Sequence, residues 1–131
     1  MKKLFAKINI QGVEYKLFAS DERKSDVNLR EMDGYCDYGT KQIVIDDAII
    51  GNAYKKHVLI HEIVHAYLHE SGLRGQGNSD WAINEQVVDW IAAMADKITK
   101  TSFIVLKEYD NLVKEKASNE RCSRQKTETT K

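Results

Sequence analysis

Alternating apolar and polar residues open the chain and predict strands. Apolar side chains recur at about every second position through residues 3–10 and 13–19, and Gln11-Gly12 separates the two runs. Such alternation around a short glycine turn is typical of a β-hairpin. A short β-branched run predicts a further strand at 41–46, for which 34–38 is the candidate partner.

Helical periodicity dominates the rest of the chain. Between Ala53 and Glu70, apolar residues wrap most of the helical circumference, which is typical of a helix buried on most sides. A second helix is predicted over 81–99 and a third over 103–116, the latter capped by Thr101-Ser102. We expect 20–33 to be a loop or short helix and 117–131 to be a polar, disordered tail. The order of elements predicts one α+β domain, residues 1–116, in which a hairpin or short sheet packs on about three helices.

Composition and charge limit the classes of protein to which this chain can belong. Lys+Arg and Asp+Glu number 20 each, so no net field favours nucleic acid or a membrane surface. No run approaches the ~18 apolar residues of a membrane span, and MKKLFAKINI lacks the apolar core of a signal peptide. Cys36 and Cys122 form no CxxC pair, and two reduced thiols are expected. These features predict a cytoplasmic protein.

All the histidines of the chain lie in the first long helix, each four residues after the last: His57, His61, His65 and His69. Residues four apart share a helix face and rise about 6 Å, so they can bind one ion, whereas residues eight apart rise about 12 Å and cannot. One ion therefore takes one neighbouring pair. The alternative functions for such histidines are core packing and a pH-sensitive surface ridge.

Glu62 distinguishes one pair from the others. His61-Glu62-Ile63-Val64-His65 forms an HExxH motif on a helix, in which two histidines hold zinc and the glutamate is the general base. Glu62 lies about 100° around the helix from His61, which suits contact with a water on the metal. A lone carboxylate on an apolar helix would otherwise cost several kcal/mol to bury. The motif predicts one Zn²⁺ held by His61 and His65, with Glu62 catalytic.

A catalytic zinc site takes three protein ligands and keeps one position open. The extended HExxHxxGxxH pattern fails, because Leu68 and Ser71 stand where it needs glycine and histidine. Glu85 is the candidate third ligand, since the twenty residues after His65 allow a loop and a returning helix.

Asp89, one turn after Glu85, is a candidate to accept the ring N–H of a ligand histidine. Two alternatives stay open. Glu85, Asp89 and Asp96 lie nearly opposite the apolar stripe of their helix, as a solvated acidic face would. His69 is the other third ligand, if the helix breaks before it.

Peptide hydrolysis also needs an oxyanion donor and a place for the substrate. Several side chains are candidates for the oxyanion or substrate contacts: Tyr35, Tyr38, Tyr54, Tyr67, His57 and His69. The strand at 41–46 would hold a peptide by main-chain pairing if its edge is free.

These motifs resemble the gluzincin metallopeptidases, in which a helix bearing a glutamate ligand follows HExxH. Asn84-Glu85 and Asp89 are similar to the thermolysin-type NExxxD segment. Residues 61–69 are more similar to the HELGHxxxH helix of the small ImmA/IrrE-type peptidases of phages and mobile elements, with Ile63-Val64 in place of Leu-Gly. The resemblance covers about residues 34–98.

The resemblance implies a zincin-like domain that binds zinc and cleaves a protein or peptide substrate, such as a phage or mobile-element regulator. Members of the family are associated with cleaving transcriptional repressors or with regulating them by other means. The alternative is therefore a non-catalytic, zinc-stabilised regulatory protein that binds a partner protein. A metal-free helical adaptor is a third hypothesis.

Overall fold

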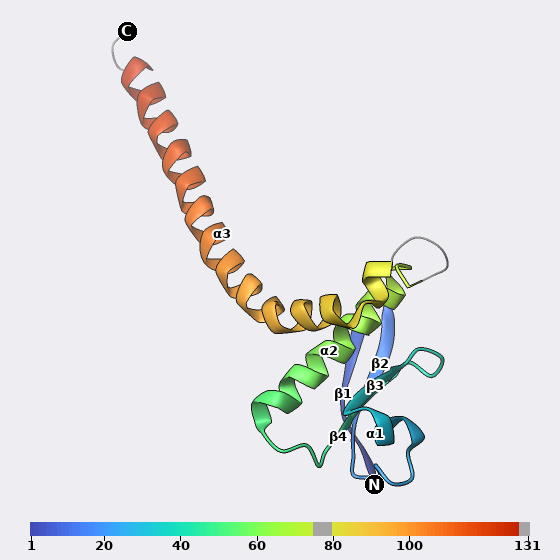
Figure 1. The fold of residues 1–131 in the computed structure, drawn as a ribbon. Helices are drawn as coiled ribbons and strands as arrows, with labels where there is room; N and C mark the ends of the chain where they lie inside the picture. Colours follow the sequence, from blue (N-terminus) through green and yellow to red (C-terminus); the bar gives the residue numbers. More distant parts are fainter. Residues whose placement is uncertain (75–79, 129–131) are drawn as a thin grey trace. The chain divides into compact units, whose positions relative to one another are not determined.

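The computed structural model describes residues 1–74 and 80–128 (Figure 1). The chain divides into two compact units, Met1–Met94 and Ala95–Lys131. The first unit contains a sheet, two helices and the start of a third helix, which confirms the predicted α+β class. The division after Met94 differs from the expected single domain over 1–116. Within the described residues, none of the helices has a stretch long and apolar enough to cross a membrane.

The N-terminal hairpin forms as predicted. Strand β1 (Lys2–Ile10) pairs antiparallel with β2 (Val13–Ser20). Gln11 and Gly12 connect them with positive φ angles of 53° and 86°, which are the angles of a type I′ turn that suits the twist of a hairpin. The Asn9 side chain accepts a hydrogen bond from the Gly12 N–H.

The other two strands extend this sheet in an order that sequence periodicity does not reveal. Strand β3 (Gly34–Asp37) pairs antiparallel with β4 (Gln42–Asp46), as predicted, and β4 also pairs in parallel with β2. The order is β1-β2-β4-β3. The strand at 41–46 therefore has no free edge to hold a peptide, because β4 pairs with β2 on one side and with β3 on the other. Its apolar run Ile43-Val44-Ile45 is buried, as expected of an inner strand. The edge strands of the described sheet are β1 and β3.

A short helix connects the hairpin to β3. Helix α1 (Val27–Glu31) lies within the segment predicted as a loop or short helix. The Asp26 carboxylate caps it by accepting hydrogen bonds from the N–H groups of Asn28 and Leu29. Asp26 also accepts a hydrogen bond from the Tyr35 hydroxyl at 2.8 Å, which ties α1 to β3.

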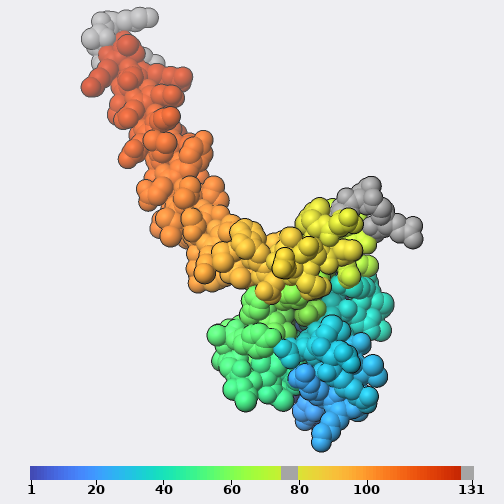
Figure 2. Space-filling model, viewed as in Figure 1, coloured from blue at the N-terminus to red at the C-terminus, as the bar shows by residue number. Residues whose placement is uncertain are grey.

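Helix α2 (Asn52–Glu70) lies between the sheet and the start of the next helix. Ala66 is buried against the sheet, with Leu59 and Ile63 packed beside it. On another side, Leu68 packs with Ala82 and Val88 from the returning chain. Figures 1 and 2 show this arrangement: the start of the last helix, in yellow, lies against α2, in green. The predicted burial of this helix on most sides is confirmed.

One long helix replaces the two helices and the tail expected after residue 80. A 3₁₀ turn, Asp80–Ile83, precedes α3 (Glu85–Glu128), and the Asn84 side chain caps it by accepting hydrogen bonds from the N–H groups of Gln86 and Val87. The predicted break at Thr101-Ser102 is absent from the described residues. Residues 117–128 are helical, which corrects the expected disorder. More than half of this segment is Ala, Glu, Arg, Gln or Lys, which favour helix, and neither glycine nor proline interrupts it. Residues 129–131 of the predicted tail lie outside the described residues.

Candidate metal centre

Three candidate ligand atoms from α2 and α3 converge on one point. The His61 Nε2 and the His65 Nε2 lie 2.9 Å and 3.3 Å from the Glu85 Oε2, and the two nitrogens are 3.1 Å apart. Ligands at about 2.0–2.1 Å from a tetrahedral zinc lie about 3.3 Å from one another. The spacing of these atoms, from two imidazoles and one carboxylate, therefore fits one zinc ion.

The hydrogen bonds within this ligand group leave one of its buried ring nitrogens without a partner among the described residues. His65 is buried, and its Nδ1 has no hydrogen-bond partner among the described residues. Burial is the main cause that lowers the pKa of His65, so the ring is held in its neutral form. Neutral imidazole is the form that binds metals. With the proton on Nδ1, the Nε2 lone pair points to the position that His61 and Glu85 share.

Glu62 is buried beside the ligand group. Its residue is only 8% exposed, and its carboxylate has no hydrogen-bond partner in the described part of the chain. The pKa of Glu62 is raised to about 7, mainly by burial; His61 opposes this shift and the nearby Glu85 charge adds to it. A carboxylate with a pKa near neutrality is well matched to taking up and releasing a proton at physiological pH.

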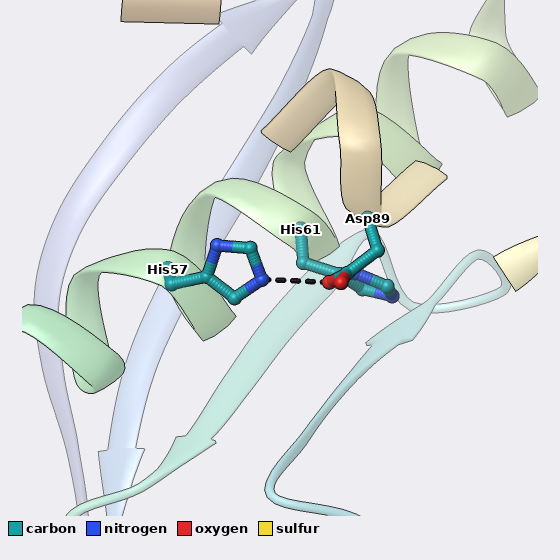
Figure 3. A group of neighbouring side chains, drawn as sticks. All are labelled: His57, His61 and Asp89. Atoms are coloured by element: carbon teal, nitrogen blue, oxygen red, sulfur yellow. Dashed lines mark hydrogen bonds and ion pairs between the residues drawn. The ribbon is translucent and has the colours of Figure 1, made fainter. Parts of the chain in front are cut away.

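Asp89 supports the ligand group from α3. Its Oδ1 lies 2.6 Å from the His57 Nε2 and 3.2 Å from the His61 Nδ1 (Figure 3). An N–H donated from the Nδ1 of His61 leaves the Nε2 lone pair free for an ion. The pKa of Asp89 is lowered, first by the hydrogen bond from His57 and also by that from His61.

His57, His61 and Asp89 are themselves close enough together to hold an ion. The distance of 2.6 Å between His57 and Asp89 is nevertheless a hydrogen-bond distance, well below the ~3.3 Å between two ligands of one zinc. The geometry of this second group therefore fits hydrogen bonds that hold the histidine rings in place. This is the role predicted for Asp89.

The start of α3 turns its acidic face toward α2. Glu85, Val88, Asp89 and Ala92 follow the i, i+3, i+4, i+7 pattern of one helix face, and Val88 and Ala92 are buried. The small Ala92 permits a close approach of the two helices. From the apolar stripe, by contrast, Ile83 and Trp90 are 52% and 59% exposed.

The alternative of a solvated acidic face holds in part for Glu85 and Asp89, whose side chains are 69% and 57% exposed, although both also contact histidines of α2. It holds for Asp96, which is exposed and pairs with Lys100 at 2.8 Å, one helical turn later.

A cleft of about 580 Å³ opens over the ligand group. Helix α2, strand β3 and the start of α3 contribute most of its walls: His57, Val58, His61, Glu62 and His65; Gly34, Tyr35 and Cys36; Glu85 and Asp89. Burial raises the pKa of the Cys36 thiol to about 12, so it stays protonated and is a poor metal ligand.

Gly34 lets β3 lie against α2. A Cβ at this position would lie 2.8 Å from the Val58 Cγ1, 3.1 Å from the Val44 carbonyl oxygen and 3.5 Å from the Glu62 Cγ. Only glycine therefore allows the edge strand to pass this close to the buried carboxylate. Gly34 was not among the predicted site residues, since nothing in the local pattern of residues reveals a close approach between distant segments.

The candidates for oxyanion or substrate contacts fall into two groups, those that line the cleft and those that do not. Tyr35, Tyr38, Tyr54 and His57 line the cleft. The hydroxyl of Tyr35 donates to Asp26, and that of Tyr54 donates to Asp33 at 2.7 Å.

Tyr67 and His69 do not line the cleft, which corrects their predicted role as direct contacts. Tyr67 is 44% exposed, because it follows His61 by six residues and so lies about 240° around the helix. The His69 ring stacks on Tyr38 at 4.3 Å and is not in either possible ligand group. As a third zinc ligand, His69 is excluded by the unbroken helix.

Comparisons of the chain with models of known protein families, with curated proteins and with solved structures found no match. Support for a metal centre therefore comes from the geometry of these side chains.

Proposed function

We propose that this chain is a zinc-dependent endopeptidase of the gluzincin type that hydrolyses a peptide bond of a protein substrate in the cytoplasm. One observation carries the proposal: the ligand atoms of His61, His65 and Glu85 converge beside the buried, unpartnered carboxylate of Glu62, within an open cleft. A structural zinc site would more often have a fourth protein ligand and no need for this carboxylate.

His61, His65 and Glu85 would hold the ion, and Asp89 would keep His61 in the required tautomer. When bound, zinc supplies a Lewis acid for the substrate carbonyl and a water of lowered pKa. The chemistry of the chain itself then centres on Glu62. Its carboxylate takes a proton from the attacking water and passes that proton to the nitrogen of the leaving amine.

The edge strand β3 offers a binding surface for an extended peptide. It ends the sheet, and its residues form a wall of the cleft opposite α2. A peptide paired with the free edge of β3 would lie beside Glu62, because Gly34 brings this strand within contact distance of that side chain. Among the candidate oxyanion donors in the cleft, Tyr38 remains once the hydrogen-bonded side chains are set aside, namely those of Tyr35, Tyr54 and His57.

The Glu62→Gln variant tests the proposal. It keeps the size of the side chain but cannot take up the proton, so hydrolysis of a casein substrate should fall by about 10²–10⁴-fold. Bound zinc, measured by elemental analysis, should stay near one ion per chain. Glu31→Gln is the matched control, because Glu31 also lines the cleft but is exposed and lies outside the ligand group; this variant should keep its activity.

The same variants distinguish the alternative, a zinc-stabilised regulator that binds a partner without cutting it. Hydrolysis that is unchanged in Glu62→Gln would contradict the peptidase. A regulatory effect that survives Glu62→Gln and disappears in His61→Ala would support the regulator instead.

A further inference from the structure

The chain after α2 is held in a fixed turn that ends at Arg74. Gly72 has a positive φ of 76°, its N–H donates to the His69 carbonyl, and the Leu73 N–H donates to the Leu68 carbonyl. This pair of bonds is a Schellman motif, and its usual apolar contact is present because Leu73 packs on Leu68. The backbone therefore delivers Arg74 to a defined place at the end of the helix.

Aromatic stacking then fixes the Arg74 side chain. Its guanidinium lies over the Tyr38 ring, 4.4 Å from the ring centre, and Tyr38 also stacks on His69 at 4.3 Å. A guanidinium held by its face keeps its N–H edge available, and this edge is a planar fork that matches a carboxylate. Less side-chain entropy is lost on binding when the fork is already positioned.

Arg74 has no acidic partner in the part of the chain that the structure describes. Salt bridges within 4.0 Å pair Lys41 with Glu70 and Arg23 with Asp46, but none includes Arg74. Arg74 is also the only lysine or arginine among the described residues that line the cleft, where the acidic ones are Glu31, Asp33, Glu62, Glu85 and Asp89. Within the described residues, its partly buried side chain is therefore not paired with any acidic group.

We infer that Arg74, stacked on Tyr38, binds a carboxylate of the substrate at the end of the cleft where β3 leads into Tyr38. The inference rests on the proposed function, since it concerns the substrate of the same cleft. The carboxylate belongs either to an acidic side chain within the peptide or to the C-terminal end of the peptide. Both sources offer the same two oxygens to the guanidinium fork.

Peptide binding to zinc-loaded Glu62→Gln protein tests the inference without turnover. The probes are acetylated and amidated eight-residue alanine-serine peptides in which one glutamate, or one glutamine as its match, is moved along the chain. The same host without glutamate but with a free C-terminal carboxylate completes the set. Dissociation constants are measured by isothermal titration calorimetry.

At one or two positions, the glutamate peptide should bind about tenfold or more tightly than its glutamine match, as expected for a charge-assisted hydrogen bond. If the free C-terminus gives the gain instead, the carboxylate is that of the chain end. The Arg74 variants are made in the Glu62→Gln protein. The gain in affinity from the carboxylate should disappear with Arg74→Gln and fall with Arg74→Lys, because lysine lacks the fork. Tyr38→Phe should keep the gain, since the ring remains, and Tyr38→Leu should reduce it.

Lys3→Gln is the charge-matched control, because Lys3 is exposed on β1 and does not line the cleft. The readout is a ratio between matched peptides, so a general loss of stability does not imitate the effect. The inference is overturned if no peptide shows a carboxylate-dependent gain, or if the gain persists in Arg74→Gln. If the Arg74-dependent gain is found but no wild-type hydrolysis is, the peptidase proposal fails and the carboxylate site stands.

Discussion

Glu85 is the member of the ligand group that depends most on a bound ion for its position. Its side chain is 69% exposed, whereas those of His61 and His65 are 17% and 8% exposed. Its two contacts in the described structure are with ligand nitrogens. Removal of this carboxylate should therefore disturb the fold less than removal of either histidine. A change in zinc affinity in a Glu85 variant can then be assigned to metal binding and not to unfolding.

Glu85→Gln should weaken zinc binding by about 100-fold or more, which exceeds the 10–100-fold typical of losing a supporting hydrogen bond. The reason is the loss of an anionic ligand at an otherwise neutral pair of histidines. Competition with a chromogenic chelator measures the affinity. Asp96→Asn, on the same helix but outside the ligand group, should bind zinc as the wild type does. Equal affinities of Glu85→Gln and the wild type would remove Glu85 from the site.

The buried Glu62 predicts a pH-dependent stability for the metal-free protein. Its folded pKa of about 7 lies above the ordinary value of 4.5, so the folded state holds the proton more tightly than the unfolded state does. The resulting stabilisation is fully present below about pH 4.5 and is lost as the pH rises through about 7. The full effect is on the order of a few kcal/mol in the free energy of unfolding.

Urea unfolding of chelator-treated protein at about pH 5 and about pH 8 measures this effect. The lowered pKa of His65 acts in the opposite direction, because stability from a neutral buried histidine is lost as the pH falls. The comparison is therefore with Glu62→Gln, in which the histidine contribution remains. Between these two pH values, the wild type should lose more stability than the variant, and an equal change in both would contradict the prediction.

At the scale of elements, the position of β3 against α2 determines whether the cleft exists. Gly34 sits at the contact, and the obstacle to a larger residue includes the Val44 carbonyl, a backbone atom that cannot rotate away. Histidine spacing and HExxH could be found from the sequence because both are local to one helix. The need for glycine at position 34 could not, because it arises between residues that are far apart in the chain.

Gly34→Ala should reduce the free energy of unfolding by about 1–3 kcal/mol, as overpacking of a close contact does. It should also reduce hydrolysis by moving β3 away from Glu62. Adding Val58→Ala removes the atom at 2.8 Å and should restore part of the stability. Gly39→Ala is the control, because its added Cβ would meet only the Asp37 carboxylate at 3.4 Å. Thermal or urea unfolding compares the wild type with these three variants, and equal stability of Gly34→Ala and Gly39→Ala would contradict the prediction.

At the scale of the whole chain, every candidate site residue belongs to the first compact unit. This unit ends at Met94, whereas the ligand group lies between His61 and Glu85. In its described residues, 95–128, the second unit is part of α3 alone. Its apolar side chains, such as Phe103 and Leu106, have no second described element of that unit to pack on.

A chain that ends at residue 100 should therefore still bind one zinc ion and keep its hydrolytic activity. The physical reason is that the metal site and the sheet depend on contacts made within residues 1–94. Zinc analysis and casein hydrolysis on the purified fragment check this expectation. Loss of zinc from a fragment that still gives a cooperative unfolding transition would assign a part of the site to the second unit.

The sequence by itself determined the hairpin, the buried helix and the HExxH group, because each depends on periodicity or spacing within one continuous segment. It also limited an ion to one histidine pair, since helical rise is fixed. The extent of α3 was not predictable from apolar spacing, because a helix continues wherever propensity allows.

Tertiary structure alone decided which face of α3 meets α2. The apolar stripe suggested one face, but burial of Val88 and Ala92 selects the face that carries Glu85 and Asp89. It also decided that β3 rather than β4 is the edge strand, and that Arg74 reaches Tyr38 at the cleft. The reason is common to all of these features: each depends on how segments distant in sequence pack together, and no local pattern of residues encodes that arrangement.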